Sequence, residues 1–247
     1  MEDAYGDYPE FWRRTERSIH SDFICRPQVL ELAGNINGKD VVDVGCGEGY
    51  VSRLLADRGA SVIGIDNSNS LIAIARKAEA MSPRGVKYFV SDATKSMTPI
   101  ILPYSQDVAI SVCVTPHLNS EQLYTYIQNT ATLVRPKGQF ILAVPHPDRF
   151  VDRAISRWWT FEYTSFPDKL DVQVPITLYT SQGKAFPVKA YPHSRQEYLK
   201  AILAADLIVK KTLAPLATAE DLKSFSHMWG KESELPFYLI FDLVKNV

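Results

Sequence analysis

Three glycines at alternate positions, Gly45, Gly47 and Gly49, give residues 43–49 the strongest signature of ligand binding in this 247-residue chain. Glycine lets the backbone turn sharply and lets a ligand approach without interference from a Cβ atom. The β-rich run VVDVG ends at the first glycine, and a helical pattern follows. Because open α/β sheets bind ligands at the carboxyl ends of their strands, this turn is predicted to hold a cofactor.

The spacing and the charge of this turn restrict the cofactor. A dinucleotide fingerprint reads G-x-G-x-x-G. Here the glycines read G-x-G-x-G, and Tyr50 stands in the place of the third one. The carboxylates of Asp43 and Glu48 would also repel a pyrophosphate at the start of the helix. We therefore expect a ligand without phosphates, and an NAD-dependent oxidoreductase is the less favoured alternative.

Two further acids follow predicted strands. Asp66 ends the run VIGID, where a carboxylate can accept hydrogen bonds from both hydroxyls of a ribose. Asp92 follows the next strand and could accept from an adenine amino group, with Asn67 and Cys113 flanking the ring. Asp92 could equally well cap a turn, since aspartate is common in that role. An adenosine-like ligand fits both acids.

The elements that must position these residues alternate between strands and helices from residue 40 onward. Strands are expected at 41–45, 62–66, 86–90, 107–114, 139–144, 207–213 and 237–244, and helices at 48–58, 68–80, 119–135 and 195–206. Such alternation is typical of a mainly parallel sheet with helices on both faces. The sequence thus predicts an α/β fold with a Rossmann-like, doubly wound, seven-stranded sheet.

Two regions stand outside this alternation. Residues 1–38 are expected to form an N-terminal helical cap, and residues 148–198 an insertion that acts as a lid over the substrate. Residues 39–147 would then be the cofactor-binding core, and residues 199–247 its C-terminal part.

At this level of detail the chain resembles a class I S-adenosylmethionine (SAM)-dependent methyltransferase of the small-molecule, type 11/25-like group. The matching segments are VVDVGCGEG, the acid in VIGID, SDA, DVAISVCVTPHL and LVRPKGQFILAV. The resemblance implies that the last strand runs antiparallel to the others. It also implies SAM as the cofactor and S-adenosylhomocysteine (SAH) as its product.

The resemblance assigns a role to each residue of the predicted cofactor site. The glycines would border the methionine end, Asp43 its ammonium, Asp66 the ribose, and Asp92 with Ala93 the adenine. The complete expected set is Asp43, Gly45, Cys46, Gly47, Gly49, Asp66, Asn67, Asp92, Ala93 and Cys113. The fourth strand ends in CVTPH, without the Asn/Asp-Pro-Pro-Tyr/Phe motif of enzymes that methylate adenine or glutamine nitrogens. No acid cluster follows it either, so we expect no metal.

Two histidines are candidates for a general base. His117 and His146 follow the fourth and fifth strands and would lie at neighbouring carboxyl ends beside the sulfonium. Histidine titrates near neutrality, which suits this role. Alternatively, His117 caps a helix and His146 packs beside two prolines.

The insertion supplies the candidate substrate-binding residues. Arg149 and Arg153 stand four residues apart and could orient an acidic group of the acceptor, or they are simply solvated. Ten aromatic residues in 148–198 could line an apolar pocket or form the insertion's own core. The expected substrate-binding set is Arg149, Arg153, Trp158, Trp159, Tyr191 and His193.

Composition excludes several other classes. With 27 Lys and Arg against 28 Asp and Glu, the net charge of -1 offers no basic surplus for nucleic acid or an anionic membrane. Three scattered cysteines without a Cys-x-x-Cys pair indicate a reduced, cytoplasmic protein. We therefore expect a methyltransferase that modifies an oxygen or nitrogen of a small, partly apolar metabolite, which could carry a carboxylate. A non-catalytic SAM-binding regulator or subunit is the alternative, and the oligomeric state stays open.

Overall fold

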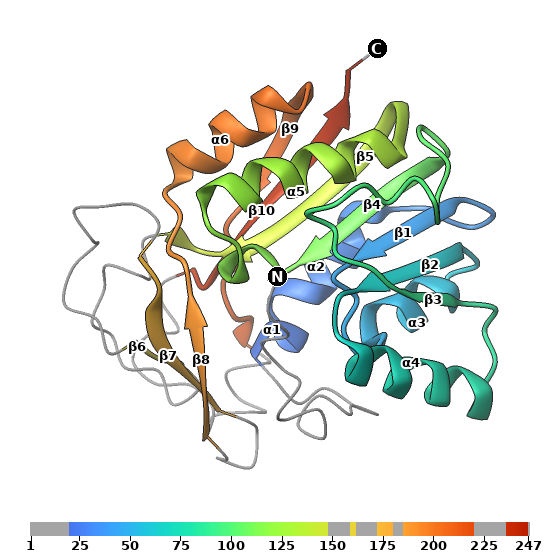
Figure 1. The fold of residues 1–247 in the computed structure, drawn as a ribbon, viewed down its shortest axis with the longest axis horizontal. Coiled ribbons are helices and arrows are strands. Elements are labelled where there is room, and N and C mark those ends of the chain that lie inside the picture. The colour runs from blue at the N-terminus through green and yellow to red at the C-terminus, as the bar shows by residue number, and fades with distance from the viewer. Residues whose placement is uncertain (1–19, 148–158, 162–171, 180–184, 220–235, 247) are drawn as a thin grey trace.

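The structure is a computed structural model, and it describes residues 20–147, 159–161, 172–179, 185–219 and 236–246 (Figure 1). Its centre is a seven-stranded sheet with the order β3-β2-β1-β4-β5-β10-β9. These strands are β1 (Asp40–Val44), β2 (Ser61–Asp66), β3 (Lys87–Val90), β4 (Gln106–Val112), β5 (Val134–Pro145), β9 (Leu207–Leu213) and β10 (Tyr238–Lys245). Neighbours from β3 through β5 pair in parallel, whereas β10 runs antiparallel to β5 and β9. The predicted fold class is confirmed.

Helices cover both faces of this sheet. Successive apolar side chains along a strand point to opposite faces, so both faces are apolar and both are covered. In β1, Val41 belongs to the hydrophobic core on one face and Val42 to the core on the other. The first core includes the helices α1 (His20–Phe23), α2 (Cys25–Ala33), α3 (Tyr50–Ala56) and α4 (Asn69–Met81). The second is covered by α5 (Ser120–Leu133) and α6 (Arg195–Ala204), which lie side by side (Figure 1).

Local sequence signals set where several of these helices begin. Ser68 caps α4 by accepting a hydrogen bond from the backbone N–H of Leu71, and Asn119 forms a capping box with Gln122 at the start of α5. The helix expected from residue 48 starts later, at Tyr50, because Gly49 adopts a left-handed φ of 82° as its N-cap. Gly49 is therefore both the last residue of the glycine turn and the cap from which α3 begins.

The junction between α5 and β5 differs from the expected one. The helix ends at Leu133 rather than Arg135, and β5 starts at Val134, which pairs with Gln106. Pairing with β4 then shifts register and resumes between Val108 and Gln139, after Lys137 takes a positive φ of 63°. Regular pairing of β5 with β4 thus begins at Gln139, where the sequence predicts the strand to start.

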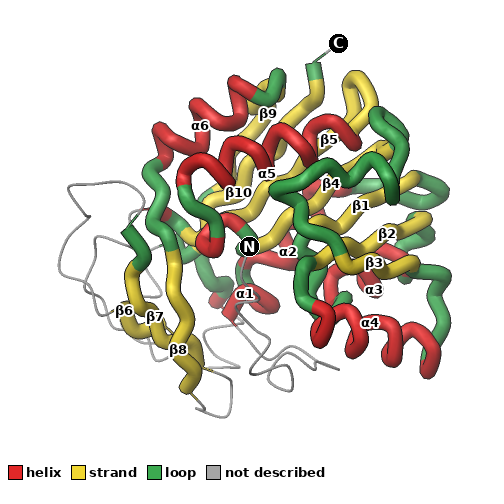
Figure 2. Tube along the Cα trace, in the orientation of Figure 1, coloured by secondary structure: helices red, strands yellow, loops and turns green. Residues whose placement is uncertain are grey.

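The predicted insertion contains a second, three-stranded antiparallel sheet of β6 (Trp159–Phe161), β7 (Val174–Tyr179) and β8 (Ala185–Ala190). It forms a separate group of strands at the lower left of Figure 2. Strand β8 contacts a short 3-10 turn, η2 (Thr115–His117), which follows β4. In the described part of the chain, no helix is both long and apolar enough to cross a membrane.

Candidate functional site

The glycine turn lies between β1 and α3, and all three of its glycines take conformations that disfavour other residues. Their φ angles are 79° at Gly45, 56° at Gly47 and 82° at Gly49. A Cβ atom at Gly45 would lie 2.1 Å from the Cγ2 atom of Val114, whereas at Gly47 its nearest neighbour would be 3.9 Å away. The turn therefore packs tightly at its start and has open space at Gly47, where a ligand can approach the backbone.

Asp66 holds the open part of this turn in place. Its Oδ2 atom accepts a hydrogen bond of 2.8 Å from the backbone N–H of Gly47, and its Oδ1 atom accepts one of 2.9 Å from Ser68. Each carboxylate oxygen can accept more than one hydrogen bond, so these contacts are compatible with ribose hydroxyls as further donors. The acid predicted for the sugar and the glycine predicted for the methionine end are thus adjacent.

Asp43 is a buried carboxylate behind the turn. It is 2% exposed, and its Oδ2 atom accepts a hydrogen bond of 2.6 Å from the hydroxyl of Ser52. Burial raises the pKa of Asp43 to about 6, although the Ser52 hydroxyl and the nearby Arg26 guanidinium act in the opposite direction. A cationic group bound here would stabilise the ionised carboxylate, which agrees with the expected contact to an ammonium.

Arg26 is a functional candidate that the sequence reasoning missed. This α2 residue is 8% exposed, forms an ion pair of 2.5 Å with Asp22, and lies with its guanidinium 6.0 Å from the ring centre of Tyr50. Its buried Nε atom has no hydrogen-bond partner among the described residues. An unpaired buried donor is costly, so a ligand acceptor at this position would be favourable. Only tertiary packing brings this arginine toward Asp43.

Gly49, the third glycine of the turn, packs against the side chain of Tyr88 in β3. A Cβ atom at Gly49 would lie 2.4 Å from the Tyr88 hydroxyl, and one at Gly64 would lie 2.7 Å from its ring. Arg53 hydrogen-bonds both the backbone and the carboxylate of the buried Glu48, at 2.6 and 2.8 Å. Glu48 is therefore paired by the protein itself, which leaves Asp43 and Asp66 as the acids nearest the open side of the turn.

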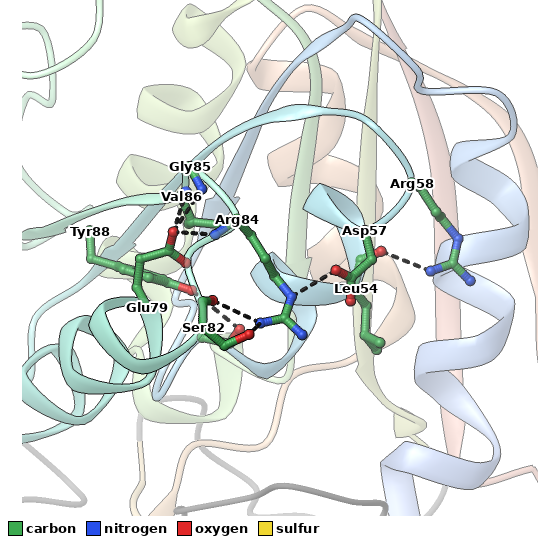
Figure 3. Close-up of polar contacts among 10 residues, drawn as sticks. Leu54, Asp57, Arg58, Glu79, Ser82, Arg84, Gly85, Val86 and Tyr88 are labelled. Carbon is green, nitrogen blue, oxygen red and sulfur yellow. Dashed lines mark hydrogen bonds and ion pairs between the residues drawn. The ribbon is translucent and has the colours of Figure 1, made fainter.

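The loop that leads into β3 is fixed by its own polar contacts (Figure 3). The Oε1 atom of Glu79 accepts hydrogen bonds from the backbone N–H groups of Arg84, Gly85 and Val86. The Arg84 side chain in turn donates to Asp57, beyond the end of α3, at 2.7 Å. These contacts tie α3, α4 and the start of β3 together and so position Tyr88 beneath the turn.

The remaining residues of the expected cofactor set lie around the same edge of the sheet. Asp92 caps a turn, which was one of the two roles expected for it. Its Oδ1 atom accepts hydrogen bonds from the backbone N–H and the hydroxyl of Thr94 at 2.9 and 2.7 Å. Burial alone would raise the pKa of Asp92, but these hydrogen bonds lower it overall. Ala93 is buried, and Asn67 is partly exposed. Burial raises the pKa of the Cys46 thiol, so this cysteine is suited to packing rather than nucleophilic chemistry.

The two candidate bases differ in their surroundings. Burial lowers the pKa of His117 to about 4, although a hydrogen bond to the backbone of Lys189 acts in the opposite direction. His117 is therefore neutral near pH 7 and is a weak proton acceptor. His146 is 7% exposed, and its backbone N–H donates to the carbonyl oxygen of Phe237 at 2.9 Å. The adjacent pairing of β4 and β5 brings the ends that carry these histidines near each other.

The expected substrate-binding residues are only partly described. Arg149, Arg153 and Trp158 lie outside the described residues, and for Trp159 only its backbone position in β6 is described. Tyr191 and His193 follow β8, and the backbone N–H of Tyr191 donates to Pro116 at 2.7 Å. His193 is 1% exposed, and its ring contacts protein groups. In the described ranges, no group of three or more His, Cys, Asp or Glu residues could hold a metal ion.

The chain is similar in sequence and in fold to known methyltransferases. Residues 41–138 match the family model described as a methyltransferase domain. Two similar curated proteins are ubiquinone biosynthesis O-methyltransferases. The one from Coxiella burnetii is 30% identical over 127 residues, 51% of this chain and 52% of that protein. The one from Pseudomonas paraeruginosa is 30% identical over 135 residues, 54% and 56% of the two chains. The chain thus spans about half the length of the curated relatives it matches.

Solved structures share the fold over most of the chain. The CcbJ methyltransferase from Streptomyces caelestis has a TM-score of 0.68 at 18% identity, covering 99% of this chain and 98% of its own. A SAM-dependent methyltransferase from Mesorhizobium loti has a TM-score of 0.66 at 18% identity, covering 89% and 96%. A geranyl diphosphate C-methyltransferase from Streptomyces coelicolor, solved with Mg²⁺, geranyl diphosphate and SAH, has a TM-score of 0.62 at 12% identity, covering 90% and 78%.

Proposed function

We propose that this chain is a class I SAM-dependent methyltransferase and that it transfers the methyl group of SAM to an oxygen or nitrogen of a small, partly apolar metabolite, releasing SAH. The observation that supports this most directly is the open glycine turn at Gly47, whose backbone N–H is held by Asp66. In this proposal a ribose-binding acid and a turn backbone with open space beside Gly47 meet at the carboxyl ends of β1 and β2.

The residues present fit a charged amino-acid nucleoside. Asp43 is buried and offers a carboxylate to an ammonium, while Arg26 offers to a carboxylate an Nε–H that no described residue accepts. Opposite charges placed a short distance apart match an amino acid better than they match a pyrophosphate. Asp66 and the turn around Asp92 then lie along the sheet edge for the ribose and the adenine.

When bound, SAM supplies an electrophilic methyl carbon on a positively charged sulfur. The chain's own task is to hold the acceptor atom in line with that carbon, to exclude water and to take up a proton where the acceptor loses one. We assign the proton-accepting role to His146 rather than to His117, whose low pKa makes it a poor base. Tyr191 is a described residue of the insertion that contacts the turn after β4, through its backbone N–H.

An oxygen acceptor is favoured by the curated relatives, which carry O-methyltransferase in their names. The predicted lid of residues 148–198 would close the acceptor side, and Arg149 and Arg153 would orient an acidic group on the acceptor. A dry, closed site strengthens its electrostatic interactions.

Calorimetry with SAH and with NADH tests donor recognition. We expect SAH to bind at micromolar concentration and NADH to give no heat. We also expect Asp66→Ala to weaken SAH binding, while Asp206→Ala, next to the edge strand β9, leaves it unchanged. Binding of NADH alone would overturn the proposal. Incubation with methyl-labelled SAM and a metabolite extract should then label one small acceptor, whereas SAH binding without any labelled product would support the regulator alternative.

The role of Arg26 has its own test. Replacing Arg26 by leucine should weaken SAH binding about 10- to 100-fold, the usual effect of losing a hydrogen bond between charged groups. Methylthioadenosine keeps the nucleoside of SAH but lacks its amino-acid carboxylate. Its affinity should stay unchanged in Arg26→Leu, which also shows that the variant is folded. Equal losses for both ligands would contradict a carboxylate contact at Arg26.

A further inference from the structure

Buried polar contacts join the turn after β4 to the end of the insertion. We call residues 114–118 the β4 turn and residues 189–198 the insertion exit. The contacts run from Tyr191 N–H to the Pro116 carbonyl (2.7 Å), between His193 Nε2 and the Leu118 carbonyl (2.8 Å), between the Tyr198 and Thr115 hydroxyls (2.9 Å), and from the His117 ring to the Lys189 backbone. These contacts fix nearly every residue of the β4 turn to the insertion exit.

A second layer of polar groups holds His193 in this arrangement. Its Nδ1 atom lies 3.3 Å from the Oε2 atom of Glu197, and the Oε1 atom of Glu197 accepts a hydrogen bond of 2.5 Å from the Ser120 hydroxyl. His193 is 1% exposed and Glu197 is 6% exposed. The approach of Nδ1 to Oε2 is a close contact rather than a hydrogen bond, whereas the hydrogen bonds to Ser120 and to the Leu118 carbonyl tie the two side chains to neighbouring segments. Buried hydrogen bonds of this kind restrict the movement of the segments that they join.

The β4 turn also touches the glycine turn. Val114 packs so closely on Gly45 that no side chain fits between them, as a Cβ atom at Gly45 would lie 2.1 Å from the Val114 Cγ2 atom. Just before it, Cys113 takes a positive φ of 59° while its N–H donates to Ala143 at 2.8 Å. Unusual backbone geometry of this kind persists only where the surroundings hold it. The β4 turn thus lies between the glycine turn and the insertion exit and contacts both.

We propose that the β4 turn couples the donor site to the insertion, and that His193, Glu197 and Tyr198 are positioning residues for this coupling. The inference rests on the proposed function, because it takes SAM and SAH as the ligands of the glycine turn. Ligand binding that fixes the glycine turn restrains Val114, and the polar contacts of the β4 turn pass this restraint to β8. By thermodynamic reciprocity, an acceptor that orders the insertion strengthens donor binding by the same factor. In this role His193 acts through Leu118 and touches no substrate.

Hydrogen exchange of the full chain with and without SAH measures this coupling without a known acceptor. In the wild type, SAH should slow exchange in peptides from the glycine turn (45–52) and also in peptides from β8 (185–191), the latter by about fivefold, which is the low end of typical coupling between sites. Tyr198→Phe removes the hydroxyl at Thr115 and keeps the ring, and Thr115→Val removes the partner. Lys200→Gln, exposed on the same helix, is the matched control.

In Tyr198→Phe and Thr115→Val, SAH should still protect the glycine turn, but its effect on β8 should fall below about twofold, whereas Lys200→Gln should behave as the wild type. A purely structural role would raise exchange in β8 equally with and without SAH, and the SAH-dependent difference would persist; that result overturns the proposal. Protection of the glycine turn without any change in wild-type β8 also overturns it. Absence of SAH binding would instead contradict the proposed function.

Discussion

The acid stability of this protein should contain two opposing contributions, from His117 and Asp43. Burial lowers the pKa of His117 from 6.5 to about 4, and burial raises that of Asp43 from 3.8 to about 6. As the pH falls below 6.5, the unfolded chain takes up a proton on His117 but the folded chain does so only near pH 4. The stability contributed by neutral His117 is therefore complete above pH 6.5 and is lost between pH 6.5 and 4.

Asp43 has the opposite sign. The folded chain takes up a proton on this carboxyl near pH 6, whereas the unfolded chain does so only near 3.8, so acid favours the folded state over this range. At about 1.4 kcal/mol per pH unit, each contribution amounts to about 3 kcal/mol between pH 7 and pH 4. In the wild type the two largely cancel, and removing either group should reveal the other.

Urea unfolding at pH 7, 6, 5 and 4 measures this directly. Relative to the wild type, the unfolding free energy of His117→Gln should rise by about 3 kcal/mol from pH 7 to pH 4, and that of Asp43→Asn should fall by about the same amount. Lys200→Gln changes an exposed side chain of α6 and should differ from the wild type by a constant. Constant differences for His117→Gln and Asp43→Asn as well would refute the assigned burial of both groups.

Three further outcomes are expected. The affinity for SAH should fall as the pH drops below about 6, where Asp43 becomes protonated, and Asp43→Asn should abolish this pH dependence in calorimetry. Gly45→Ala should lower the free energy of unfolding in urea by about 2–5 kcal/mol, because it combines a left-handed φ with a clash on Val114. Gly38 also has a positive φ but no neighbour that a Cβ atom would meet, so Gly38→Ala should lower it by only about 1 kcal/mol. Cys46 should react with a maleimide at pH 8 at least about 10-fold more slowly in the folded protein than in urea, because burial raises its pKa; equal rates would contradict that burial.

Local sequence signals were sufficient for most of the fold. The glycines of residues 45–49 predict a sharp turn, and all three adopt the positive φ angles that glycine permits. Ser68 and Asn119 cap α4 and α5 at the residues where the sequence predicts these helices to begin, because capping depends on a side chain and a backbone N–H only three residues away. The structure starts β5 at Val134, whereas the sequence predicts a strand from residue 139. Val134 joins the strand because it pairs with Gln106, which is far away in the sequence.

The amino-acid sequence by itself determined the alternation of strands and helices, the position of the glycine turn and the acids that follow it, because each depends on spacing within one or two elements. Only the tertiary structure decided the environment of the side chains. Arg26 came to lie near Asp43, His117 lost its basicity, and His193 came to hold the Leu118 carbonyl. Burial and long-range pairing set these properties, and both arise when separate elements pack together, which no local pattern records.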